Sequence, residues 1–198
     1  MRVLIAGASG TVGKAAAAAL AHHELVRVGR SSGDIRADLS DPESVRQMFE
    51  TAGPVDAVVA CTGHVHFGPL AKMTSENFLH GLTDKLMGQA NLVLIGQHHV
   101  KDNGSFTLTS GILDRDPIRL GANASAVNAA LAGFVMAAAI EMPRGIRINV
   151  VSPGLLQDSA QKYAGVFPGH EPVASDRVGL AYVKSVDGAL TGKVITVG

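Results

Sequence analysis

The chain has 198 residues, of which 46% are hydrophobic and 17% are charged, and its 17 basic and 17 acidic side chains balance at neutral pH. This composition is typical of a globular protein, and the balanced charge excludes a basic field that would hold nucleic acid or an anionic membrane surface. A single cysteine, Cys61, excludes a disulfide framework within the chain and fits a reducing compartment.

The first apolar run is only a few residues long, and we expect no stretch of the chain to approach the length of a membrane span. We therefore expect a cytoplasmic protein without a signal peptide, formed by one domain over residues 1–198. The apolar fraction is slightly high for a monomer, which favours a buried interface between subunits.

Short β-type runs alternate with helical stretches along the chain. Seven strands are predicted, at residues 2–6, 25–29, 34–37, 55–60, 104–109, 146–151 and 193–197. Five helices are predicted between them, at residues 12–22, 41–51, 74–97, 122–142 and 175–186. This alternation predicts an α/β fold, a single Rossmann-type doubly wound parallel sheet of about seven strands with helices on both faces. The irregular segment 152–174 has the length of a lid or binding loop.

The first strand leads into a glycine-rich turn and then a helix, in the sequence RVLIAGASGTVG. Gly7 allows a tight turn, Gly10 lets the backbone approach phosphates, and Gly13 lets the helix pack close to the strand. The start of the helix also offers free N–H groups and the positive end of the helix dipole. This order predicts a pyrophosphate site, with a purely structural turn as the alternative. The residues expected around the phosphates are Gly7, Ser9, Gly10, Thr11, Val12 and Gly13.

Ligands of such sheets bind beyond the carboxyl ends of the strands. Besides the glycine turn, the segments expected at this edge are Gly29–Ser32, Asp38–Leu39, Cys61–Gly63, Thr109–Gly111 and Ser152–Gly154.

The residues after the second strand indicate which dinucleotide binds. A site for NAD usually has an acidic residue here for the ribose hydroxyls, but this chain has Gly29 followed by Arg30, Ser31 and Ser32. A guanidinium and hydroxyls attract a 2′-phosphate, which a carboxylate would repel. The sequence therefore predicts NADP (NADPH) as the cofactor, unless Arg30 is simply a solvated surface residue.

The chain resembles the short-chain dehydrogenase/reductase family as a short, atypical member. The resemblance rests on the glycine turn, on Cys61-Thr62-Gly63, and above all on residues 129–154, AALAGFVMAAAIEMPRGIRINVVSPG. It implies that Asp38 and Leu39 lie near the adenine and that Cys61, Thr62 and Gly63 lie beside the cofactor. It also implies that Val151, Pro153 and Gly154 lie near the nicotinamide. One departure is Thr11, which stands where the family's middle glycine is usually found.

The resemblance also defines which catalytic residues to expect. The family transfers a hydride between the nicotinamide and a carbonyl carbon, using a Ser, a Tyr with a Lys one helical turn later, and an Asn on the preceding long helix. Ser110 matches the Ser. Counting back from Glu141 places Ala124 at the Tyr position and Asn128 at the Lys position, and Lys85 stands where the Asn is expected.

We therefore hypothesise that Lys85 points into the site and restores the positive charge lost at position 128, while Asn128 bonds the ribose or Lys85. Lys85 would then donate the proton itself or hold a water that does. Burial would lower the pKa of the ammonium from about 10.4 toward neutrality. The predicted protein is an oxidoreductase for a small carbonyl or quinone substrate, with Ser110, Lys85 and Asn128 at its centre. The alternatives are a surface lysine beside a degenerate site, and an NADP(H)-binding sensor or scaffold without catalysis.

Other polar residues are expected to have smaller roles. His64 and His66 offer only two ligands, so no metal site is predicted. Asp114 and Asp116 are expected to be solvated, and Cys61 to be a small packing residue. By resemblance, the helices at 74–97 and 122–142 form the interface of a homodimer or homotetramer.

Overall fold

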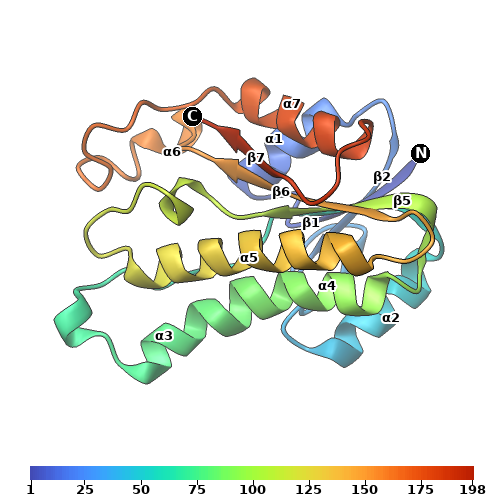
Figure 1. The fold of residues 1–198 in the computed structure, drawn as a ribbon, viewed down its shortest axis with the longest axis horizontal. Helices are drawn as coiled ribbons and strands as arrows, with labels where there is room; N and C mark the ends of the chain where they lie inside the picture. The colour runs from blue at the N-terminus through green and yellow to red at the C-terminus, as the bar shows by residue number, and fades with distance from the viewer.

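The computed structural model describes residues 1–198 as three layers, with one parallel sheet between two layers of helices (Figure 1). The strands are β1 Arg2–Ala6, β2 Glu24–Gly29, β3 Ile35–Arg36, β4 Val55–Ala60, β5 Val100–Thr109, β6 Arg147–Pro153 and β7 Val194–Val197. They lie in the order β3-β2-β1-β4-β5-β6-β7. The order reverses direction between β1 and β4, which is where ligands of doubly wound sheets bind. The predicted fold class is confirmed.

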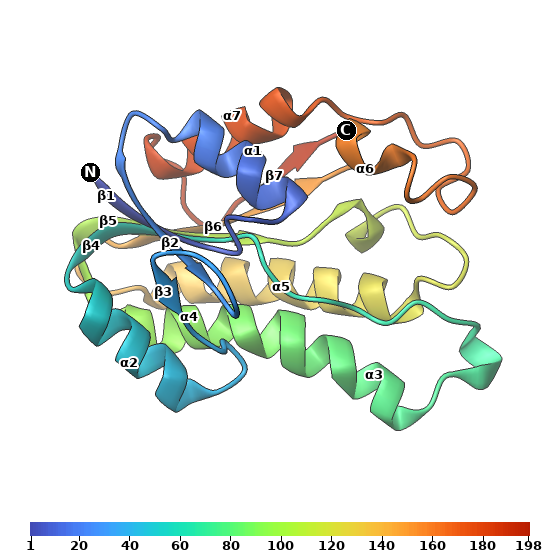
Figure 2. The ribbon, with the colours of Figure 1, turned by 180° about the vertical axis from the view of Figure 1, so that it is seen from behind.

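Helices cover both faces of the sheet. Helices α1 Thr11–Ala19 and α7 Ser175–Val186 pack together on one face, and α2 Pro42–Ala52, α4 Gly88–Gly96 and α5 Ala122–Glu141 cover the other (Figures 1 and 2). The shorter helical segments are η1 Leu70–Lys72, α3 Ser75–Gly81, η2 Leu82–Met87, η3 Ile112–Asp114 and α6 Gln157–Ala160.

Each face of the sheet has its own apolar core. Because side chains alternate along a strand, Leu4 and Ala6 of β1 join the core under α2, α4 and α5, whereas Val3 and Ile5 join the core under α1 and α7. All four side chains are fully buried. A continuous apolar run is therefore what a strand covered on both faces requires.

The helical stretch predicted at 74–97 is divided into three parts. The chain passes from α3 into the six-residue π-helix η2 and then into α4. The wider turn of a π-helix leaves no sequence pattern, and such turns are frequent at functional sites.

Helix α5 corrects one expectation from the sequence. Its 20 residues have a mean hydropathy of 1.5 in an 18-residue window, so by length and composition alone this helix could span a membrane. Core helices of soluble proteins pass the same test, and α5 packs against β6 and η2. Only a third of the window is buried, and Met136 and Ile140 are 53% and 87% exposed. The apolar composition of α5 thus exceeds what its packing on the sheet needs.

Candidate active site

The glycine turn after β1 has the backbone geometry that a phosphate site needs. Gly7 has a positive φ of 79°, and a Cβ atom there would lie 2.4 Å from the carbonyl oxygen of Cys61. A Cβ at Gly13 would lie 2.0 Å from the carbonyl oxygen of Gly7. Only glycine fits at either position, so the turn brings β1, β4 and the start of α1 into close contact.

A cavity of about 350 Å³ opens at the carboxyl ends of β1, β2 and β4. Nine predicted cofactor residues line it: Gly7, Ser9, Gly10, Arg30, Ser31, Leu39, Cys61, Thr62 and Gly63. The other six do not line it, and their roles stay predictions: Thr11, Val12, Gly13, Asp38, Pro153 and Gly154. The lining also includes residues that the sequence did not single out as ligands, of which His64 and Asp84 are ionisable.

The segment 152–174 passes close to Thr11, at the carboxyl edge of the sheet. The hydroxyl of Ser159 in α6 lies 3.5 Å from that of Thr11, at the first residue of α1. Part of the segment therefore lies beside the phosphate turn, which agrees with the expectation of a loop near a binding site.

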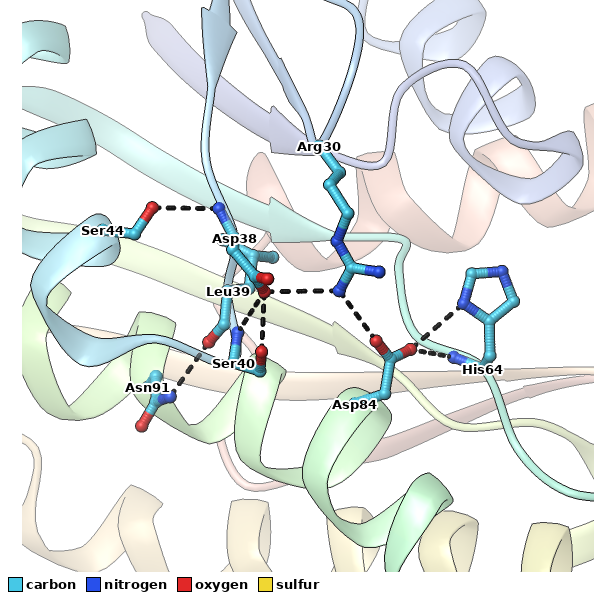
Figure 3. A network of polar contacts seen from close by, with 8 residues as sticks. All are labelled: Arg30, Asp38, Leu39, Ser40, Ser44, His64, Asp84 and Asn91. Carbon is cyan, nitrogen blue, oxygen red and sulfur yellow. Dashed lines mark hydrogen bonds and ion pairs between the residues drawn. The ribbon is translucent and has the colours of Figure 1, made fainter. Parts of the chain in front are cut away.

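One end of the cavity, between Arg30, Asp38 and Asp84, carries a network of charged groups (Figure 3). We call it the adenosine end, because the sequence predicts the adenosine of the cofactor there. Nη2 of Arg30 donates to Oδ1 of Asp84 at 3.0 Å and to Oδ1 of Asp38 at 3.3 Å. Asp38 also accepts from the backbone N–H and the hydroxyl of Ser40, at 3.0 and 2.7 Å. Arg30 is 61% exposed and lines the cavity, but its guanidinium is already paired with two carboxylates.

Lys85, Ser110 and Asn128 lie together near the carboxyl end of β5. They come from three separate places: Lys85 from η2, Ser110 from directly after β5, and Asn128 from α5. Nζ of Lys85 donates to Oδ1 of Asn128 at 2.8 Å and to the backbone carbonyl of Ser110 at 2.9 Å. Asn128 is 4% exposed and Ala124, one turn earlier, is 1% exposed. Lys85 is itself half-buried and its ammonium is bonded to both partners, so it is not the solvated surface lysine of the alternative interpretation.

Two features hold Lys85 in place. It belongs to the π-helix η2, whose first turn directs Asp84 to the adenosine end of the cavity while Lys85 reaches Ser110 and Asn128. Gly63 packs directly on it, since a Cβ at Gly63 would lie 2.5 Å from Cα of Lys85. Burial lowers the pKa of Lys85 to about 8, against a smaller opposing effect of the carboxylate of Asp114.

Asp114 was expected to be solvated, and this expectation is wrong. Its side chain is only 7% exposed, because Oδ2 accepts from the hydroxyls of Ser110 at 3.1 Å and Ser152 at 2.8 Å. Arg115 pairs with Oδ1 at 2.9 Å and also donates to Ser152 at 2.6 Å. The 3-10 segment η3, directly after β5, turns Asp114 back onto Ser110, so this carboxylate sets the orientation of the Ser110 hydroxyl.

A buried polar network holds the ends of β4 and β5 together. Gln89 of α4, fully buried, donates to the carbonyl oxygens of Thr62 and Thr109 and accepts from the N–H of Thr109. The hydroxyl of Tyr182 lies 2.7 Å from that of Thr109 inside the core, so this tyrosine is structural. Burial raises the pKa of Cys61 to about 11, which agrees with a packing residue rather than a nucleophile.

Three potential metal ligands lie together outside the cavity, at the ends of α1 and α7. Nε2 of His22 and Nε2 of His23 lie 3.1 and 2.8 Å from the two carboxylate oxygens of Asp187. These separations are those of ordinary hydrogen bonds. His64 contacts Asp84 instead, and the prediction of no metal site stays a prediction.

A family model described as enoyl-(acyl carrier protein) reductase matches residues 2–181. The chain therefore belongs to this family of short-chain dehydrogenases/reductases, and the resemblance predicted from the sequence is confirmed.

Solved structures and curated relatives support the same assignment. The protein lin1944 from Listeria innocua is 46% identical, with a TM-score of 0.99 over 100% of both chains. A small-chain dehydrogenase solved in complex with NADPH is 25% identical, with a TM-score of 0.87 over 100% of this chain and 96% of the other. A vibriobactin-specific 2,3-dihydro-2,3-dihydroxybenzoate dehydrogenase of Vibrio cholerae is 30% identical over 64% of this chain and 51% of its own. The chain thus spans 51 to 59% of the length of the curated relatives it matches.

Proposed function

We propose that the protein is an NADP(H)-dependent oxidoreductase that transfers a hydride to or from a small carbonyl or quinone substrate. The observation that carries the proposal is the position of Lys85, whose ammonium lies in the site between Ser110 and Asn128. Membership of a reductase family and a structural neighbour solved with NADPH support the class of reaction and the cofactor.

The residues around the cavity fit a dinucleotide. Gly7, Ser9 and Gly10 line the cavity beside the start of α1, where the free N–H groups of the helix would hold a pyrophosphate. Arg30 and Ser31 line the cavity where the sequence places a 2′-phosphate, and Cys61 to Gly63 line it toward β4. When bound, the nicotinamide supplies or accepts the hydride.

Lys85 can supply the proton that carbonyl reduction needs. An ammonium has three donors, and two of them are used on Asn128 and Ser110, which leaves one for a substrate oxygen. A pKa of about 8 keeps the ammonium protonated at neutral pH, yet makes it a far better acid than an exposed lysine. The proton passes from Nζ to the oxygen as the carbon receives the hydride, and neutral Lys85 then takes a proton from solvent.

The test is NADPH oxidation by the purified protein with aldehydes, ketones and quinones, compared with the variant Lys85→Met. We expect Lys85→Met to reduce turnover about 10³-fold while NADPH binding is retained. Lys184→Met, on the exposed side of α7, removes the same charge elsewhere and should leave turnover unchanged. Full activity of Lys85→Met would refute the assignment of the proton donor.

A dinucleotide sensor without catalysis is the second candidate, because α5 carries Ala124 and neither tyrosine of the chain lies on this helix. Wild-type protein that binds NADPH but turns over none of the acceptors would favour this candidate.

We also propose that the exposed apolar face of α4 and α5 packs against a second copy of the chain. The two helices cover the same face of the sheet (Figure 2), and they expose Leu94, Met136 and Ile140. Light scattering should give a dimer or tetramer that Ile140→Asp dissociates. A monomeric wild-type protein at micromolar concentration would contradict this.

A further inference from the structure

The structure fixes an acidic side chain, Asp84, in the wall of the cofactor cavity. Its Oδ2 accepts from the backbone N–H of His64 at 2.6 Å and lies 3.1 Å from Nδ1 of the same histidine. The carboxylate is 15% exposed, and it lines the cavity together with His64 and Arg30. Because a main-chain N–H holds Asp84, its position does not depend on a flexible partner.

Arg30 reaches across the cavity to this carboxylate. It extends from the end of β2, whereas Asp84 belongs to η2, and the ion pair joins the two sides of the adenosine end (Figure 3). Asp38, from the segment after β3, contacts the same nitrogen of Arg30. The residue expected to hold a 2′-phosphate is therefore shared between two carboxylates.

The two carboxylates at this end of the cavity limit how strongly Arg30 attracts a dianion. Arg30 is the one Lys or Arg among the residues that line the cavity. Burial alone would raise the pKa of Asp84, but hydrogen bonds from His64 and Arg30 outweigh it and lower the pKa, so Asp84 is ionised at neutral pH. Hydrogen bonds from Ser40 likewise lower the pKa of Asp38. One guanidinium thus faces two carboxylates, and a 2′-phosphate would add close to two further negative charges.

We propose that Asp84 is a specificity-determining residue, whose carboxylate competes with the 2′-phosphate of NADP(H) for Arg30. This competition reduces the factor by which the site prefers NADP(H) to NAD(H). The proposal rests on the proposed function, since it concerns how tightly the same cofactor site discriminates between the two dinucleotides. NAD(H), which has a ribose hydroxyl instead of the phosphate, leaves the pair of Arg30 and Asp84 intact. NADP(H) must draw Arg30 away from Asp84 or bring its phosphate close to this carboxylate, and both cost affinity.

The test is a fluorescence titration of NADPH and NADH against wild-type protein and Asp84→Asn, which keeps the shape of the side chain and an oxygen for the N–H of His64. We expect Asp84→Asn to tighten NADPH about tenfold and to change NADH less than twofold, because Arg30 is then released from its strongest partner to pair with the 2′-phosphate, which NADH lacks. In an Arg30→Met background the same substitution should produce a clearly smaller gain. Asp102→Asn, an exposed residue paired with Arg144, is the matched control for the loss of one negative charge.

Three other outcomes would contradict the proposal or the proposed function on which it rests. Unchanged or weaker NADPH binding in Asp84→Asn would overturn the proposal and make Asp84 a residue that merely orients Arg30. Equal tightening of both dinucleotides would also overturn it, since the effect would then not involve the 2′-phosphate. If Asp84→Asn lost its fold by circular dichroism, Asp84→Ser would be titrated under the same expectations. A wild-type protein that bound neither dinucleotide would refute the proposed function itself, whereas NADPH binding that depends on Arg30 but not on residue 84 would refute only this inference.

Discussion

The two ends of the cofactor edge are built in different ways. The proposed phosphate cradle depends on backbone: Gly7 and Gly13 leave no room for a Cβ, and the glycine turn joins β1 to α1 as in other doubly wound sheets. The proposed proton-donating end depends on residues from distant segments, with Lys85 from η2, Ser110 from directly after β5 and Asn128 from α5. Backbone geometry tolerates little change, whereas a charge can be supplied from another element that reaches the same point.

The π-helix η2 connects the two ends. Its successive residues Asp84 and Lys85 contact Arg30 at the adenosine end and Asn128 at the other. In an ordinary α-helix successive side chains lie about 100° apart around the axis. The wider turn of a π-helix alters this angle, and with it the directions of both Asp84 and Lys85. Substitutions at the two ends should therefore differ in effect: loss of stability at the glycine turn, and loss of turnover at Lys85 and Ser110.

The largest effect after that of Lys85 is expected at Ser110. In this structure the Ser110 hydroxyl donates to Asp114, and a bound substrate would have to draw that single donor to its reacting oxygen. Ser110→Ala removes the donor, so we expect kcat to fall about 10²-fold. Affinity for NADPH should stay the same, since the cavity at the adenosine end is unchanged. Steady-state kinetics with a titration of NADPH checks this, and an unchanged kcat would remove Ser110 from the site.

Substitution of a glycine in the cradle should lower the stability of the fold, because the added Cβ has no room. Gly13→Ala forces a Cβ against the carbonyl oxygen of Gly7, so the free energy of unfolding should fall by about 2 kcal/mol in urea denaturation. Gly133→Ala, in α5 with no atom within 4 Å of the new Cβ, is the control and should gain about 0.5 kcal/mol from reduced backbone entropy. Equal stability of the two variants would contradict the close packing of the turn.

The smallest effect is expected from Asp114→Asn. The carboxylate of Asp114 raises the pKa of Lys85 against the effect of burial, so its removal should lower that pKa below 8 by up to about one unit. The pH above which carbonyl reduction declines should move down by the same amount. Asp116→Asn, in the same loop but 62% exposed, should leave the profile in place.

The sequence predicted the strands, the main helices and the glycine cradle because these depend on local patterns: apolar runs, alternation and glycine spacing. Lys85 and Asn128 were found by counting positions along the family's helices, although no local pattern distinguishes them. Their contact could be expected only from the resemblance, and the structure brings them to 2.8 Å.

Other features could not be predicted because they depend on how loops return to the sheet. Asp84 lies 54 residues from Arg30, and nothing in either segment marks them as partners. Asp114 lies in a polar stretch, DRDP, that is typical of a solvated loop, but η3 folds it onto Ser110 and Ser152. The π-helix leaves no periodic signal in the sequence, so the different directions of Asp84 and Lys85 could not be predicted either.

The central claim is that Lys85 donates the proton, and the most direct test is the rate of single-turnover NADPH oxidation between pH 6 and pH 10. Since protonated Lys85 is the active form and its pKa lies at about 8, the rate should be constant below pH 8 and fall about tenfold per pH unit above it. Lys85→Met should show a low rate without this decline. A wild-type rate that stays flat to pH 10, or a variant that follows the wild-type profile, would contradict the role of Lys85.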